Sequence, residues 1–201
     1  MLRNNSVYAE KLQKWGAERV ILFVVAACIL ARVRGMRFAC LTRDWSLLPL
    51  AAVELFFWTA QICAWNEVYI FIRWASAIQT AYLLALLFPI FRHRLYREAC
   101  AGAAMTVIGT MLNRWVMSVN GGKMPVYPTL SRWTGYYRDG AMAAAGDGLH
   151  VLMDGSTKLK LLSDWIDVGF SIMSIGDVLI HGFVFWIVYR TICAWNRGKA
   201  V

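Results

Sequence analysis

Charged residues are scarce in this sequence. Asp, Glu, Lys and Arg make up 16% of its 201 residues, whereas a soluble domain carries about 25%. Hydrophobic residues make up 59%, and ten tryptophans and eight tyrosines are among them. Aromatic residues in such numbers are typical of anchoring at membrane–water interfaces. The composition therefore predicts an integral membrane protein rather than a water-soluble domain.

Motifs for catalysis and cofactor binding are also missing. The sequence has no H-E-x-x-H, no G-x-S-x-G, no phosphate-binding loop and no haem attachment motif. Its five cysteines form no C-x-x-C pair and lie within or beside apolar runs, which argues against a disulfide framework and a zinc site. We therefore predict no catalytic residue, no metal and no cofactor. A non-enzymatic role is favoured, and an enzymatic one stays open.

The net charge of +9 has to be explained in a chain with so few charges. On a soluble protein it would suggest nucleic acid as a partner. Here the arginines gather in short loops between apolar runs, mainly at 32–43 and 92–97, which is the pattern that orients membrane proteins. We expect no nucleic-acid partner. The expected partners are the lipid bilayer and, as an alternative, other membrane subunits.

Five apolar stretches are expected to cross the membrane. They are residues 20–31, 45–65, 68–91, 99–119 and 170–195. The first is short, because a transmembrane helix needs about 20 apolar residues. The predicted fold class is all-α, an integral membrane helix bundle with about five transmembrane helices and one long extracytoplasmic loop. If the first stretch does not cross, four spans remain.

The charge pattern also predicts an orientation. Residues 1–19 form a polar N-terminal extension, 20–195 the membrane domain and 196–201 a cytoplasmic tail. If residues 45–195 cross four times, both basic loops and the C-terminus share the cytoplasmic side. The segment 119–169, with five Lys or Arg and five Asp, then faces outward. Five spans would place the basic N-terminus outside, against the positive-inside tendency.

Polar side chains within the spans are expected to lie at matching depths. A helix rises about 1.5 Å per residue, which places Arg73, Asn113, Arg114 and Asp177 in one layer of the outer leaflet. Ionisable groups are costly in lipid, so we expect Asp177 to pair with Arg73 or Arg114. His181 follows Asp177 by four residues and shares its helix face. This layer is either a plain interhelix lock or part of a ligand site.

Two further polar residues are expected near the middle of the bilayer. Glu54 and Gln79 lie about equally far from the turn at residues 66–67, so an antiparallel hairpin brings them to one level. We expect the Glu54 carboxyl group either to be protonated or to be bonded to Gln79.

The outward segment has its own local signals. Gly121 and Gly122 can take positive φ and reverse the chain, and Pro125 favours an extended course. Asn120 is expected to cap the preceding helix or bond the turn. Residues 148–152 should form a short extended piece that runs into a tight turn at 154–156.

Several side chains of this segment are candidates for contact with a ligand or with the membrane. His150 and Asp164 are the candidates for ligand contact. Ser163 with Asp164 is also expected to cap a short helix containing Trp165. Four aromatic residues suggest a lid at the level of the lipid headgroups: Trp133, Tyr136, Tyr137 and Trp165.

The order N-G-G-x-M-P-V, then a His and a Thr, then L-x-D, then S-I-G-D resembles an uncharacterised family of small bacterial multi-pass membrane proteins, a domain of unknown function. The resemblance covers about residues 20–195. The matching positions are Asn113, Asn120, Gly121, Gly122, Met124, Pro125, Val126, His150, Thr157, Leu162, Asp164, Ser174, Ile175, Gly176 and Asp177. It implies a bacterial cell membrane, and with the charge pattern a cytoplasmic C-terminus. It implies no reaction.

Three functions remain in view. The first is binding or translocation of a small polar ligand or lipid headgroup at the outward face, through an extracytoplasmic cap over the buried Arg/Asp layer. The second is a non-catalytic accessory or structural subunit of a larger membrane complex. The third is a membrane-embedded hydrolase or transferase acting through His150 and Asp164.

Overall fold

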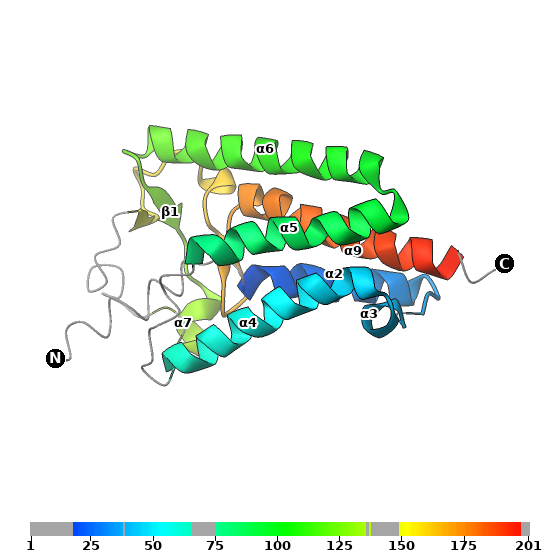
Figure 1. Cartoon of the computed structure of the whole chain (residues 1–201). Coiled ribbons are helices and arrows are strands. Elements are labelled where there is room, and N and C mark those ends of the chain that lie inside the picture. Colours follow the sequence, from blue (N-terminus) through cyan, green and yellow to red (C-terminus); the bar gives the residue numbers. More distant parts are fainter. Residues whose placement is uncertain (1–17, 38, 66–74, 136, 138–148, 198–201) are drawn as a thin grey trace. The chain divides into compact units, whose positions relative to one another are not determined.

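The chain is mostly helical in the computed structural model, which describes residues 18–37, 39–65, 75–135, 137 and 149–197 (Figure 1). Its α-helices are α2 (Glu18–Val33), α3 (Cys40–Arg43), α4 (Leu48–Trp65), α5 (Ala75–His93), α6 (Tyr96–Val119), α7 (Leu130–Thr134) and α9 (Ile175–Arg197). Two short 3-10 helices are η1 (Trp45–Leu47) and η3 (Lys160–Leu162). The strands are β1 (Met124–Val126), β2 (His150–Leu152), β3 (Ile166–Asp167) and β4 (Ile172–Met173). The expected predominance of helix is confirmed.

Each of the five apolar stretches overlaps one of the longer helices. Among the described residues, α9 alone is both long and apolar enough to cross a membrane. Its 23 residues extend over about 35 Å, more than the roughly 30 Å of a hydrocarbon core. Shorter apolar helical stretches are Val20–Val33, Trp45–Ala60 and Thr80–His93. A bundle of five spans therefore stays a prediction.

The chain divides into two compact units. Unit 1 contains Met1–Gly102 and Phe183–Val201, and unit 2 contains Ala103–Gly182. Both α6 and α9 begin in one unit and end in the other. The polar residues expected near the outward face fall mostly in unit 2.

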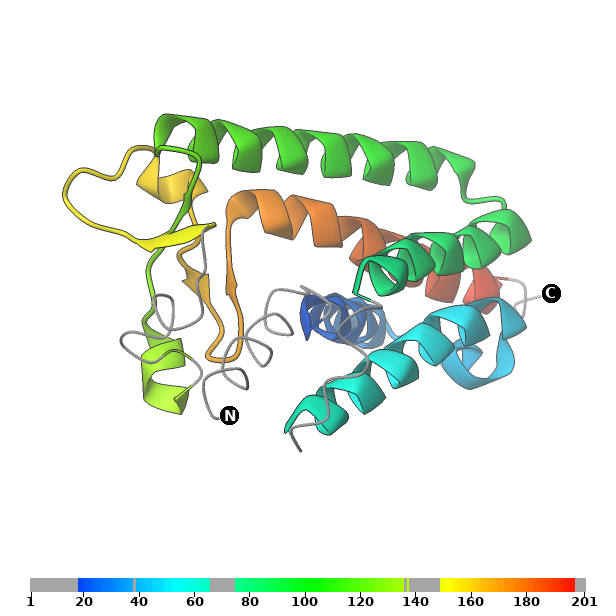
Figure 2. The same cartoon turned by 60° about the vertical axis from the view of Figure 1, so that its left-hand side comes forward.

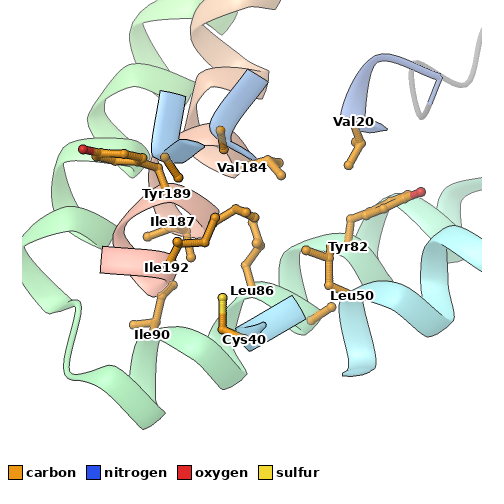
Figure 3. Close-up of a cluster of buried hydrophobic side chains, with 14 of the residues drawn as sticks. Val20, Cys40, Leu50, Tyr82, Leu86, Ile90, Val184, Ile187, Tyr189 and Ile192 are labelled. Carbon is orange, nitrogen blue, oxygen red and sulfur yellow. The ribbon is translucent and has the colours of Figure 1, made fainter. Parts of the chain in front are cut away.

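The core of unit 1 is apolar and brings together side chains from α2, α4, α5 and the later part of α9 (Figure 3). Phe57 of α4, Leu86 of α5 and Ile187 of α9 are fully buried in it. These helices are apolar around most of their circumference, so that many residues outside the core are apolar too. This is the composition expected for helices that face lipid as well as each other.

The end of α6 follows the glycine prediction. Gly121 has φ +68° and Gly122 has φ +79°. The amide of Gly122 donates to the carbonyl of Met117 over 2.8 Å, closing the last turn as in a Schellman motif. Pro125 then lies in β1, as expected. The chain thus leaves the helix by a tight reversal into an extended segment.

We call residues 120–174 the cap, and two small sheets organise its described part (Figure 2). Strands β1 and β2 are parallel, with Met124 opposite His150 and Val126 opposite Leu152. Strands β3 and β4 are antiparallel, with Ile166 opposite Met173. The extended piece predicted near residue 150 and the turn after it are both present.

Two expectations about the cap are wrong. Trp165 lies outside the helices, because Asp164 before it pairs with β1: its amide donates to Pro125 O over 3.0 Å, and its carbonyl accepts from Tyr127 N over 2.7 Å. The last long helix begins at Ile175 rather than near residue 170, because the residues before it form β4.

Other expectations concern residues outside the described ranges. These are residues 1–17 of the polar N-terminal extension, the turn at 66–67, and the side chains of Arg73, Gln79 and Tyr136.

Candidate functional site

The S-I-G-D sequence forms a reciprocal cap at the start of α9. The hydroxyl of Ser174 accepts a hydrogen bond from the amide of Asp177 over 2.9 Å, and the Asp177 carboxylate accepts from the amide of Ser174 over 3.3 Å. This is the geometry of a capping box, with Asp at the position that Glu or Gln usually takes. Two amides that the helix itself leaves unbonded are thereby satisfied.

Asn113 of α6 completes this network from the facing helix. Its side-chain amide donates to Asp177 Oδ1 over 3.0 Å, and its Oδ1 accepts from the hydroxyl of Ser174 over 2.8 Å. Gly176 makes the approach possible, because a Cβ at that position would overlap Asn113 Oδ1 and the carbonyl oxygen of Gly109. We call Asn113, Ser174 and Asp177 the helix-junction network.

Two of the residues expected near Asp177, Arg114 and His181, belong to the described part of the chain. Arg114 is exposed on α6, and Arg73 lies outside the described residues. His181 contacts the backbone carbonyl of Asp177 through Nδ1 over 2.9 Å. Through its contacts with Asn113 and Ser174, Asp177 thus holds the start of α9 to α6.

Glu54 is enclosed within unit 1. Both of its carboxyl oxygens are buried and have no hydrogen-bond partner among the described residues, and the same holds for the hydroxyl of Tyr82 on α5. Tyr82 lies close to the carboxyl group of Glu54. The predicted alternative, a bond from Glu54 to Gln79, involves a side chain outside the described part of the structure.

His150 and Asp164 meet in the cap. They flank β1 on opposite sides, His150 opposite Met124 and Asp164 opposite Val126. Since Met124 and Val126 share one face of the strand, their partners point to that same face. His150 Nε2 lies 3.9 Å from Asp164 Oδ2, and the side chains are 28% and 5% exposed. The pair therefore combines a buried carboxylate with an imidazole that solvent reaches.

Asn120 braces the cap against the end of α6. Its Nδ2 donates to the carbonyl oxygens of Val116 and of Lys158, over 2.9 and 3.0 Å. Its Oδ1 accepts from the amide of Lys158 over 3.0 Å. The expectation that Asn120 caps the helix or bonds the turn is confirmed, and the side chain also holds the segment around Lys158.

Asp167 organises the start of α7. Its Oδ2 accepts from Thr129 N and from the amide and hydroxyl of Ser131, and its Oδ1 accepts from Gly169 N over 2.8 Å. Burial raises the pKa of Asp167, but these hydrogen bonds outweigh it and hold the pKa below its usual range. Asp154 is likewise bonded by Ser156 and Thr157 within its own turn, and these bonds lower its pKa.

Polar contacts in unit 1 connect the two basic loops with each other and with the C-terminal end of α9. Arg37 of the first basic loop exchanges two hydrogen bonds with Asn196, near the end of α9, over 3.1 and 2.8 Å. Asp44 contacts His93 Nε2 over 2.5 Å, which ties the first loop to the second. Glu98 pairs with Arg190 over 2.5 Å.

Residues 39–189 match DUF5317, a family of unknown function. The chain belongs to this family. No curated protein and no solved structure matches the chain. Its expected place in an uncharacterised family is confirmed, whereas the motifs as family markers and the multi-pass character of the family stay predictions.

The structure also assigns roles that the sequence interpretation missed. Ser174 and Asp177 form a capping box, and a serine followed three residues later by an acidic residue before an apolar run is its recognised signal. Asp167 was not singled out, and a lone Asp in a loop carries no local sign that it will cap a helix 36 residues away. Only the tertiary fold shows that contact.

Proposed function

We propose that this chain is a multi-pass protein of the bacterial cell membrane, with α2, α4, α5, α6 and α9 crossing the bilayer. Exposed apolar side chains on these helices support this. They include Ile29, Leu55, Leu83, Phe91, Met111 and Trp186. Large apolar residues on several faces would be unfavourable in water but are suited to lipid.

The orientation in this proposal places the basic segments in the cytoplasm and the cap outside. The contacts of Arg37 with Asn196, and of Asp44 with His93, support a common side for both basic loops and the C-terminal end of α9. A shared basic side is the arrangement that the positive-inside tendency favours.

In this proposal the cap binds a small polar ligand or lipid headgroup at the His150–Asp164 pair. The observation that carries the proposal is the 3.9 Å approach of a partly exposed imidazole to a buried carboxylate. That distance exceeds a hydrogen bond but lies within ion-pair range. The buried carboxylate lies beside the ring, and the partly exposed imidazole is the polar group that a ligand would contact from solvent. The helix-junction network has a structural role in this proposal, since it holds α6 and α9 together.

The orientation is tested with reporters. Alkaline phosphatase inserted at Gly155, a position in the cap with open space around it, should be active in cells. Green fluorescent protein fused after Val201 should fluoresce. An inactive phosphatase at Gly155 would overturn the orientation.

The ligand site is tested by native mass spectrometry of the protein purified in a mild detergent. A retained lipid or solute should be lost in His150→Ala and in Asp164→Asn. The matched controls are Val151→Ala, an exposed neighbour on β2, and Asp154→Asn, an exposed carboxylate of the same cap. Equal retention in all four variants would contradict a site at this pair.

The helix-junction network favours a second candidate, an accessory subunit of a membrane complex. Its polar groups satisfy one another, as expected of a lock between helices. A protein that copurifies in fixed stoichiometry, without any bound small molecule, would favour this candidate over the first.

A further inference from the structure

Charge is distributed unevenly over the described part of the cap. Lys123, Arg132, Lys158 and Lys160 are all exposed. Asp164 and Asp167, in contrast, face inward to His150 and to the start of α7. Asp154 is exposed, but its carboxylate is bonded by its own turn. Basic side chains therefore outnumber acidic ones on the exposed surface of the described part of the cap.

Three of these lysines lie close together at the end of α6. Asn120 bonds both the amide and the carbonyl of Lys158, and its own carbonyl accepts from Lys123 N over 3.3 Å. Lys160 begins η3, two residues beyond Lys158. Figure 2 shows this segment beside the C-terminal end of α6.

Apolar side chains are exposed within the same group. Leu161 of η3 is 75% exposed. Trp165 is 42% exposed, and its indole N–H donates to the carbonyl of Leu161 over 2.7 Å, which holds the ring against η3. This combination of lysines with an exposed leucine and tryptophan is suited to an anionic membrane interface. There the lysine ammonium groups contact lipid phosphates, and the apolar side chains insert at the boundary between the headgroups and the acyl chains.

We propose that Lys123, Lys158, Lys160, Leu161 and Trp165 form a docking surface for anionic phospholipid headgroups of the outer leaflet. This inference rests on the outward orientation proposed above, and it concerns a surface separate from the His150–Asp164 pair. The end of a membrane-crossing α6 lies at headgroup level, so the lysines next to Asn120 lie there as well. Clustered lysine ammonium groups attract the negatively charged phosphodiester groups of anionic lipids.

The lysine side chains can be changed without disturbing the brace. Within the described part of the chain, Lys123, Lys158 and Lys160 form hydrogen bonds through backbone atoms only. A triple variant with Lys123→Gln, Lys158→Gln and Lys160→Gln therefore removes charge while keeping the fold, which thermal unfolding in detergent verifies. The matched triple variant with arginine at the same positions keeps the charge.

The test uses the full chain in nanodiscs that contain a photoactivatable phosphatidylglycerol or the equivalent phosphatidylcholine. Crosslinks from phosphatidylglycerol should map to residues 158–165 and exceed those from phosphatidylcholine about fivefold or more, since each lysine near an anionic surface contributes roughly a fivefold preference. The glutamine variant should fall to the phosphatidylcholine level, and the arginine variant should match the wild type.

Two results would overturn the docking surface. One is an equal yield from both lipids; the other is a yield that the glutamine variant leaves unchanged. If the phosphatase at Gly155 is active and one of these results is obtained, only the lipid-docking proposal is wrong. The proposed orientation is then still supported.

Discussion

Asn113 Nδ2 donates a 3.0 Å hydrogen bond to Asp177 Oδ1, and this bond connects the middle of α6 to the first turn of α9. The two residues are 64 positions apart in the sequence. Ser174 closes the cycle by donating to Asn113 and capping Asp177. An amide is suited to the middle of this cycle because it donates to the carboxylate and accepts from the hydroxyl at once.

Asn113→Asp should destabilise the protein by about 2 kcal/mol or more, because it removes the donor to Asp177 and places two carboxylates in contact. Thermal unfolding in detergent measures the loss. Adding Asp177→Asn exchanges the two groups and restores one donor, so the double variant should recover part of the loss. Arg114→Gln, an exposed change at the next position, is the control. No recovery in the double variant would argue against this contact.

Gly176→Ala should be strongly destabilising, by about 1–3 kcal/mol, since the added methyl group would overlap Asn113 Oδ1 and the Gly109 carbonyl oxygen. Gly155→Ala is the matched control, because its Cβ meets open space. That substitution should be neutral or slightly stabilising. Similar melting temperatures for the two variants would contradict the close packing of α6 on α9.

The sequence predicted the parts of this fold that depend on local chemistry. Gly121 reverses the chain with positive φ, and Pro125 lies in a strand. Both outcomes follow from the conformational range of a single residue. The long helices also overlap the apolar stretches, since hydrophobic runs of that length rarely form anything else.

Contacts between distant residues could not be predicted in the same way. Counting residues along a helix gives the depth of Asn113, Arg114 and Asp177, but not the direction in which each side chain points. The sequence therefore named Arg73 and Arg114 as partners for Asp177 and missed Asn113, which donates to its carboxylate. The charge count of the cap has the same weakness, because it ignores which groups the fold buries.

Asp167→Asn should reduce stability near neutral pH and have little effect in acid. The folded-state pKa of Asp167 is lowered, so its carboxylate stabilises the fold above the unfolded value of about 3.9. That contribution is lost as the pH falls through the folded-state pKa. The difference in melting temperature between wild type and variant should thus be full at pH 6 and shrink below about pH 4. A difference that does not change with pH would contradict this prediction.

The Asp44→Ala substitution should lower the stability of the protein more than His93→Gln does. Asp44 is 6% exposed and accepts from the amide and hydroxyl of Ser46 as well as contacting His93. Burial raises its pKa, and the bonds from Ser46 and His93 lower it below the usual range, so the group is a carboxylate at neutral pH.

Removing that carboxylate leaves the buried Ser46 hydroxyl and the His93 ring without their acceptor, at a cost of about 2–4 kcal/mol. His93→Gln keeps the bonds to Ser46 and should cost less. Thr42→Ala, an exposed change in the same loop, is the control. The double variant Asp44→Ala/His93→Ala then measures the coupling that ties the two basic loops together, and a coupling near zero would mean that each loop is held by other contacts.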